Sequence, residues 1–125
     1  MIINETELEK LCVYFYPKIF NSKDIILHDV KIKILDDIYF DADIKYYNID
    51  TKIKAKIRII IDDKIKILLD GIIKYGFINL NLNKIFQELI KDNEYVVIKN
   101  ENIIIENDII KKVNLKAGQL CIELK

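Results

Sequence analysis

The chain has 125 residues, of which 51% are hydrophobic and 32% are charged. This length suits one domain, residues 1–125, that buries roughly two thirds of the surface of the unfolded chain. The composition excludes a disordered protein. Twenty basic residues balance twenty acidic ones. Without a net charge, the protein has no long-range electrostatic attraction to nucleic acid or to an acidic membrane. Nucleic acid is therefore not an expected partner.

The cysteines and the first residues indicate neither a metal site nor a leader. Cys12 and Cys121 show no C-x-x-C spacing, and His28 alone cannot complete a zinc set with them, so we expect free thiols and no cofactor. The first 20 residues carry acids where a signal peptide needs cations. We expect a cytoplasmic protein without a transmembrane segment. Export by a route that needs no cleaved signal stays open.

The first predicted element is a helix at about residues 5–16. Asn4 and Glu7 have the spacing of a capping box. The apolar residues that follow share one helical stripe, and they are Leu8, Leu11, Cys12, Phe15 and Ile19. Pro17 is expected to end or kink the helix. Residues 21–24 are expected to form a polar turn.

A meander of four long strands is predicted next, because apolar residues then recur at every second position. The turns are expected at Asp36–Asp37, around Asn48 and at Asp62–Asp63. Gly71 and Gly76 interrupt the alternation in the fourth strand. We expect a bulge or a sharp bend there, and a strongly coiled strand.

A short second helix is predicted after Asn81 or Asn83, either of which can cap it. Four final strands are expected at residues 95–99, 103–106, 109–116 and 120–124. The expected fold class is therefore α+β: an N-terminal helix, a long and strongly twisted antiparallel meander, a short second helix and a C-terminal hairpin.

The third long strand carries a cation at every second position, and these cations are Lys52, Lys54, Lys56 and Arg58. They could form an anion-binding strip for phospholipid headgroups or nucleic acid, or only the wet side of a half-buried strand. If the apolar faces of neighbouring strands coincide, Asp41 and Asp43 lie opposite two of the last three cations. A three-residue turn at residues 62–64 brings Asp70 beside Lys56. We therefore favour a neutralised face.

Catalytic and metal-binding patterns are poor. His28 and Asp29 are adjacent in a predicted strand, so their side chains point to opposite faces. Asp29 is therefore not expected to orient His28 as a general base. The paired acids lack the spacing of a calcium loop. The segment from Gly71 to Gly76 lacks the Lys-Ser/Thr of a phosphate loop. We predict that the protein is not an enzyme.

The fourth strand and the next helix carry a surplus of apolar residues, over the range 68–82. Both faces of that strand are apolar. Two short helices can cover only part of the two faces of a single sheet. Core packing, a dimer interface, a partner groove and a ligand cavity are the alternatives. The candidate wall residues of such a groove are Phe15, Phe40, Ile57, Leu69, Phe77 and Phe86.

The order of elements resembles the tubular lipid-binding (TULIP) superfamily, which includes bactericidal/permeability-increasing protein, small bacterial members and accessory proteins of clostridial toxins. The resemblance covers the leading helix, the long strands, the helix near INLNLNKIFQELI and the closing VNLKAGQLCIEL. It implies a sheet rolled around the first helix, an apolar channel for acyl chains and no catalysis. Because the chain is shorter than the larger members, a second copy or a larger partner would be needed to complete a tunnel.

Two hypotheses about function follow from the apolar surplus and the resemblance. The first is a non-enzymatic module that binds a lipid or another apolar ligand. The alternative is a protein-interaction subunit that buries the same apolar strip in a homo- or hetero-oligomer. Peripheral membrane contact is compatible with either hypothesis.

Overall fold

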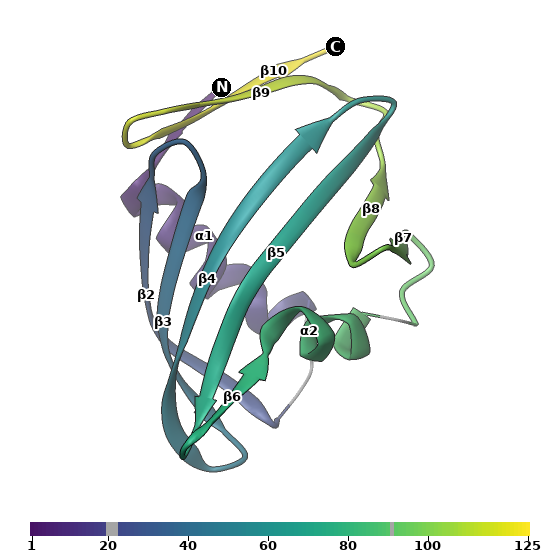
Figure 1. Cartoon of the computed structure of the whole chain (residues 1–125). Helices are drawn as coiled ribbons and strands as arrows, with labels where there is room; N and C mark the ends of the chain where they lie inside the picture. The colour runs from purple at the N-terminus through teal and green to yellow at the C-terminus, as the bar shows by residue number, and fades with distance from the viewer. Residues whose placement is uncertain (20–22, 91) are drawn as a thin grey trace.

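The computed structural model describes residues 1–19, 23–90 and 92–125. It has the predicted α+β class, with two helices and two antiparallel sheets (Figure 1). The first part of the turn expected at residues 21–24 lies outside the described residues.

The predicted meander is confirmed and forms most of the larger sheet. Its strands pair in chain order, and they are β2 (Ile25–Ile34), β3 (Ile38–Tyr46), β4 (Ile49–Ile61) and β5 (Lys64–Tyr75). Three shorter strands extend it: β6 (Ile78–Asn81) and β8 (Asn102–Glu106) both pair with β5, and β7 (Val96–Lys99) pairs with β8. The long strands alternate apolar and polar residues, so one face of the sheet is wet and the other is apolar.

Of the bulge or sharp bend expected at Gly71 and Gly76, a bulge at Gly71 is wrong, whereas the chain does turn sharply at Gly76. β4 and β5 keep one register along their whole pairing. Gly71 lies opposite Ala55, and a Cβ atom at Gly71 would lie 2.5 Å from the backbone oxygen of Lys54 and 2.7 Å from Cβ of Ala55. Glycine is therefore needed here for close approach of two strands. The irregularity of this sheet lies in β2 instead, between Leu27 and Asp29.

Asn83 fills a gap at the outer edge of β5. On the edge of β5 that faces away from β4, β8 pairs with the first half of the strand and β6 with its last residues. The backbone near Leu69 has no strand partner on that edge. The buried amide of Asn83 donates to the carbonyl oxygens of Leu69 and Glu101, both at 2.9 Å. Gln87 in turn donates to the Asn83 side-chain oxygen at 2.7 Å. The buried polar groups are thereby satisfied.

The closing hairpin does not join the meander. β9 (Ile110–Lys116) and β10 (Gln119–Leu124) form a separate three-stranded sheet with β1 (Ile2–Asn4), a strand that sequence patterning did not predict. This small sheet lies across one end of the molecule, at the top of Figure 1. The backbone N–H of Gly118 donates to the Ile34 carbonyl oxygen at 2.8 Å and so joins the small sheet to the end of β2.

The first helix, α1 (Glu5–Ile19), is one turn longer than predicted, and Pro17 lies inside its last turn rather than ending it. The predicted capping box is confirmed: Glu7 N–H donates to Asn4 Oδ1 at 2.8 Å, and Asn4 N–H donates to Glu7 Oε1 at 3.0 Å. The second helix, α2 (Leu82–Ile90), begins after Asn81, whose side-chain oxygen accepts from Lys84 N–H at 3.2 Å.

α1 lies along β2 on the inner side of the sheet, behind the strands in the view of Figure 1. Oε2 of Glu9 accepts from Ile32 N–H and Oε2 of Glu5 accepts from Ile34 N–H, both at 2.7 Å. At the other end of β2, the Tyr16 hydroxyl donates to a carbonyl oxygen at 3.1 Å. The helix therefore satisfies free backbone groups of an edge strand, which is one way that proteins protect sheet edges.

The hydrophobic core lies on the inner face of the meander. Its most deeply buried side chains are Ile34, Ile44 and Ile73. On β4, Ile53 is buried and Ile57 packs against the core, as the alternation predicts.

Candidate apolar-ligand site

A cavity of about 540 Å³ lies between the inner face of the large sheet, α1 and α2. This volume falls in the usual range of ligand pockets. The lining side chains are almost all aliphatic or aromatic, and they are Leu11, Cys12, Phe15, Tyr16, Ile25, Leu27, Phe40, Ile53, Ala55, Ile57, Ile67, Leu69, Leu82, Ile85, Phe86, Leu89, Ile90, Asn93, Val96, Ile103 and Ile105. None of these side chains carries a charge at neutral pH.

Five of the six predicted wall residues lie in this wall, and they are Phe15, Phe40, Ile57, Leu69 and Phe86. They come from α1, three strands and α2, so the fold brings together residues that are far apart in the sequence. The placement of Phe77 is corrected: its side chain is 109% exposed, at the turn between β5 and β6, and it does not line the cavity. The apolar surplus over residues 68–82 had suggested Phe77 as a wall residue, but the chain reverses at Gly76, whose φ is 64°.

The cavity exists because the middle of the sheet carries small residues. Ala55 lines the cavity, and its partner on β5 is Gly71, which has no side chain to contribute. α1 is held along β2, and α2 packs on β5, so the two helices stand on either side of this thin region. α1 therefore does not fill the inner face of the sheet. The small residues Ala55 and Gly71 are visible in the sequence, but they indicate a cavity only once it is known that they lie opposite each other.

The cavity reaches the surface beside α1. Leu11 and Phe15 line it and are also 39% and 45% exposed. Among the described lining residues, Asn93, in the loop that follows α2, is the only one with an amide side chain. Its Oδ1 accepts from Tyr95 N–H at 2.9 Å, which fixes the orientation of that side chain. The described wall is thus almost entirely apolar.

The two ionisable groups in the wall are held in their neutral forms. Burial raises the pKa of the Cys12 thiol, and the nearby Glu9 carboxylate raises it further. Burial also raises the pKa of the Tyr16 phenol. Both shifts favour the neutral form of the group. The chemistry that such a wall favours is binding of apolar surface.

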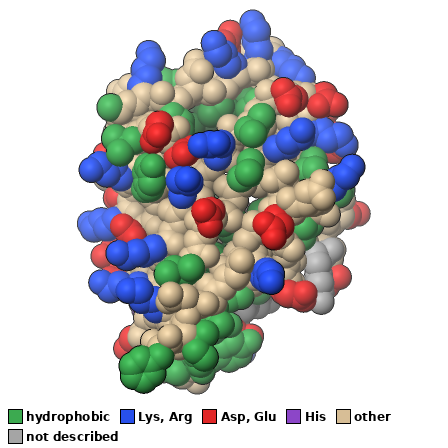
Figure 2. All heavy atoms as spheres, viewed as in Figure 1, with side chains coloured by type: hydrophobic (Ala, Val, Ile, Leu, Met, Phe, Trp, Pro, Cys, Tyr) green, Lys and Arg blue, Asp and Glu red, His purple; other side chains and the backbone are tan. Residues whose placement is uncertain are grey.

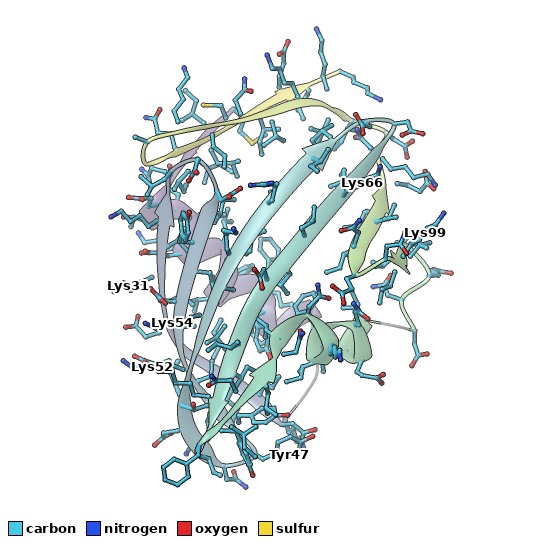
Figure 3. All side chains as sticks on the ribbon, in the orientation of Figure 1. Lys31, Tyr47, Lys52, Lys54, Lys66 and Lys99 are labelled. Carbon is cyan, nitrogen blue, oxygen red and sulfur yellow. The ribbon has the colours of Figure 1, made fainter. Side chains whose placement is uncertain are left out.

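The four cations of β4 are exposed at alternate positions on the outer face of the sheet, away from the cavity. Lys52 and Lys54 are labelled in Figure 3. Asp41 lies opposite Lys54 and Asp70 lies opposite Lys56, as predicted. Asp43 lies opposite Lys52, one cation earlier than expected. The ammonium of Lys52 and the carboxylate of Asp43 are 3.9 Å apart. The candidate anion strip is thus interleaved with carboxylates.

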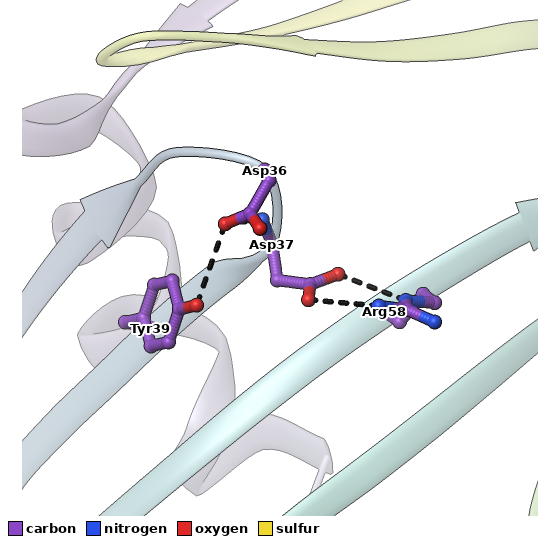
Figure 4. A network of polar contacts seen from close by, with 4 residues as sticks. All are labelled: Asp36, Asp37, Tyr39 and Arg58. Carbon is purple, nitrogen blue, oxygen red and sulfur yellow. Dashed lines mark hydrogen bonds and ion pairs between the residues drawn. The ribbon is translucent and has the colours of Figure 1, made fainter.

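Arg58, the last member of the strip, is bound to Asp37 in the turn between β2 and β3 (Figure 4). Nε of Arg58 donates to one carboxylate oxygen at 3.0 Å and NH2 donates to the other at 3.1 Å. Hydrogen bonds from Arg58 hold the pKa of Asp37 below its usual range and raise the pKa of Arg58, while burial of Asp37 opposes this effect. Sequence patterning missed this pair, because it gave Asp37 only the role of a turn residue.

Among the described residues, no three side chains of His, Cys, Asp or Glu gather closely enough to hold a metal ion. Within the same part of the chain, no helix is both long and apolar enough to cross a membrane. Neither the protein-family models, nor the curated proteins, nor the solved structures compared with this chain gave a match. The function is therefore inferred from the residues themselves.

Proposed function

We propose that this chain is a non-enzymatic module that binds a lipid or another apolar ligand between α1, α2 and the inner face of the large sheet. The observation that supports this function is the uncharged lining of a cavity of about 540 Å³ that opens at the surface. A core that served only stability would close such a space, because protein interiors pack to crystal-like density and empty volume is destabilising.

The uncharged wall of the cavity favours an apolar ligand such as an acyl chain. Each buried methylene contributes about 0.8 kcal/mol of transfer free energy, so a long acyl chain gains affinity without any hydrogen bond. A polar headgroup fits best at the opening beside Leu11 and Phe15, because the deeper wall offers no charge to pair with it. The TULIP-like order of elements agrees with this ligand class.

The test combines native mass spectrometry with displacement of a fluorescent fatty acid by oleate. We expect adduct masses on the purified protein and saturable probe binding. Ala55→Leu places a larger side chain in the cavity and should weaken probe binding at least about tenfold, since it removes space for roughly two methylenes. Lys54→Leu adds the same side chain on the outer face and should leave binding unchanged. A clean apo mass with no saturable probe binding would contradict the proposal.

A second candidate function, a protein-interaction subunit, is favoured by one observation. α1 carries exposed apolar residues, and they are Leu11, Val13, Tyr14 and Phe15. A partner that covered them would also close the cavity. Light scattering over a range of concentrations separates the two candidates. A strictly monomeric protein that binds the fatty acid excludes the subunit in its homo-oligomeric form.

Anion binding by the outer face is the third candidate. Salt-dependent retention on heparin would reveal an unneutralised strip. Because carboxylates lie opposite three of its four cations and Asp37 binds the fourth, we expect weak retention.

A further inference from the structure

Two turns meet at the end of the molecule opposite the small sheet (Figure 1). One joins β3 to β4 and the other joins β5 to β6. The ring of Tyr46 packs edge to face on Tyr47, with centroids 4.6 Å apart, and on Tyr75, with centroids 5.6 Å apart. The hydroxyl of Thr51 also donates to the carbonyl oxygen of Lys74. These contacts hold the two turns together as one structural unit.

This unit, the aromatic tip, exposes large apolar side chains. Its exposed members are Tyr47, Ile49, Phe77 and Ile78. The space-filling view shows hydrophobic side chains gathered at this lower end of the molecule (Figure 2). Phe77 is 109% exposed, so no neighbour shields its ring from water. A fully exposed Phe contributes nothing to the stability of the fold.

The turns themselves point to a role for these side chains. Two-residue hairpin turns favour Gly, Asn and Asp, because their central residues adopt positive φ. Here Tyr47 has a φ of 48°, a conformation that bulky residues seldom adopt, and Phe77 follows Gly76. Both tight turns thus carry an aromatic residue that their geometry does not require. Strained and exposed residues of this kind are typical of functional sites.

We propose that the aromatic tip inserts Phe77 and Ile78 into the interfacial region of a lipid bilayer. The tip is convex and narrow, whereas a stable protein interface needs roughly 800 Å² from each partner. Tyrosine rings such as those of Tyr46 and Tyr47 suit the boundary between headgroups and acyl chains. Inserted this way, the tip directs the long axis of the sheet away from the membrane.

The charges around the tip indicate which membrane it binds. Lys45 lies opposite Asp50 and Lys52 lies opposite Asp43, while Lys74 lies opposite Asn79. Carboxylates therefore balance two of these three cations, which leaves little attraction to anionic headgroups. Insertion depends on apolar side chains, so phosphatidylcholine vesicles with and without phosphatidylserine should bind equally well. High salt should not release the protein.

The chain contains no tryptophan, so a single introduced one reports on insertion. Phe77→Trp should show a blue-shifted fluorescence maximum when phosphatidylcholine vesicles are added, because the indole leaves water. Tyr95→Trp is the control, since Tyr95 is exposed but lies in the loop before β7. Its emission should not change. A Phe77→Trp spectrum that vesicles leave unaltered would overturn the proposal.

Vesicle flotation gives a second measurement. Phe77→Ser and Ile78→Ser should each lower the bound fraction, with about a tenfold or larger loss of partitioning for Phe77→Ser. Ile109→Ser, at an exposed isoleucine outside the tip, should bind as the unmodified chain does. Loss of self-association instead of vesicle binding in Phe77→Ser would show that the tip contacts protein and would refute membrane insertion. Ala55→Leu should bind vesicles normally, so failure of the cavity proposal is distinguishable from failure of this one.

Discussion

At the scale of single residues, the structure distinguishes side chains that the alternating pattern of a strand treats as equivalent. Arg58 sits in a row with three lysines, yet only its planar fork can bind both oxygens of Asp37. Asp37 has a side chain only 5% exposed, whereas the Arg58 side chain is 58% exposed. The pair therefore joins the turn between β2 and β3 to β4 on the outer face of the sheet.

The Asp37–Arg58 pair predicts a pH effect. The pKa of Asp37 is lower in the folded protein than in the unfolded chain, so the contribution of the pair is present above the ordinary Asp range, near pH 4, and is lost as pH falls through the folded pKa. Arg58→Met should lower the urea midpoint at pH 7 and have a progressively smaller effect below pH 4. Urea denaturation of both proteins between about pH 7 and 3 measures this. A difference that stayed constant with pH would contradict the assignment.

Gly71 gives a second prediction at this scale. Gly71→Ala places a methyl group against the Lys54 carbonyl and Ala55, so we expect a loss of about 1–3 kcal/mol of stability through overpacking. Chemical denaturation measures the loss. Gly76→Ala is a useful comparison, because its cost arises from positive φ and not from a clash. An unchanged stability in Gly71→Ala would mean that β4 and β5 can separate locally at little cost.

At the scale of elements, α1 protects the edge of β2 and also forms one side of the cavity. Its carboxylates bind the edge, while Leu11 and Phe15 face the cavity. Of the predicted apolar stripe, Leu8 and Cys12 pack against the core and Leu11 and Phe15 line the cavity, while the side chain of Ile19 lies outside the described part of the chain. Sequence patterning could not identify Glu5 and Glu9 as partners of β2, because an acidic residue on a helix surface ordinarily faces water.

Glu9 tests the role of α1. Glu9→Ala leaves the N–H of the buried Ile32 without its acceptor and should destabilise the protein by about 1–3 kcal/mol. Glu9→Gln keeps an oxygen acceptor and should cost less. Lys10→Ala, at the exposed neighbouring position, should change stability by less than about 0.5 kcal/mol. Equal losses for Glu9→Ala and Lys10→Ala in urea denaturation would show that the edge contact is not stabilising.

At the scale of the whole molecule, the fold separates three surfaces. The cavity lies on the inner face, the neutralised cations lie on the outer face, and the aromatic tip lies at the end away from the small sheet. A lipid-binding module with an inserting tip would use two of them together, since a ligand that leaves a bilayer must reach the opening beside α1. The opening and the tip are thus parts of one proposed route.

Sequence patterning alone predicted both helices, the four long strands, their inward and outward faces and five residues of the cavity wall. Local chemistry is sufficient for these features: periodicity, capping residues and turn residues act over a few positions. The pairing of β1 with β10, the contact between Asp37 and Arg58 and the exposure of Phe77 became visible only in the folded chain. The first two join segments that are far apart in the sequence, so no local pattern can encode them, and the third follows from the chain reversal at Gly76.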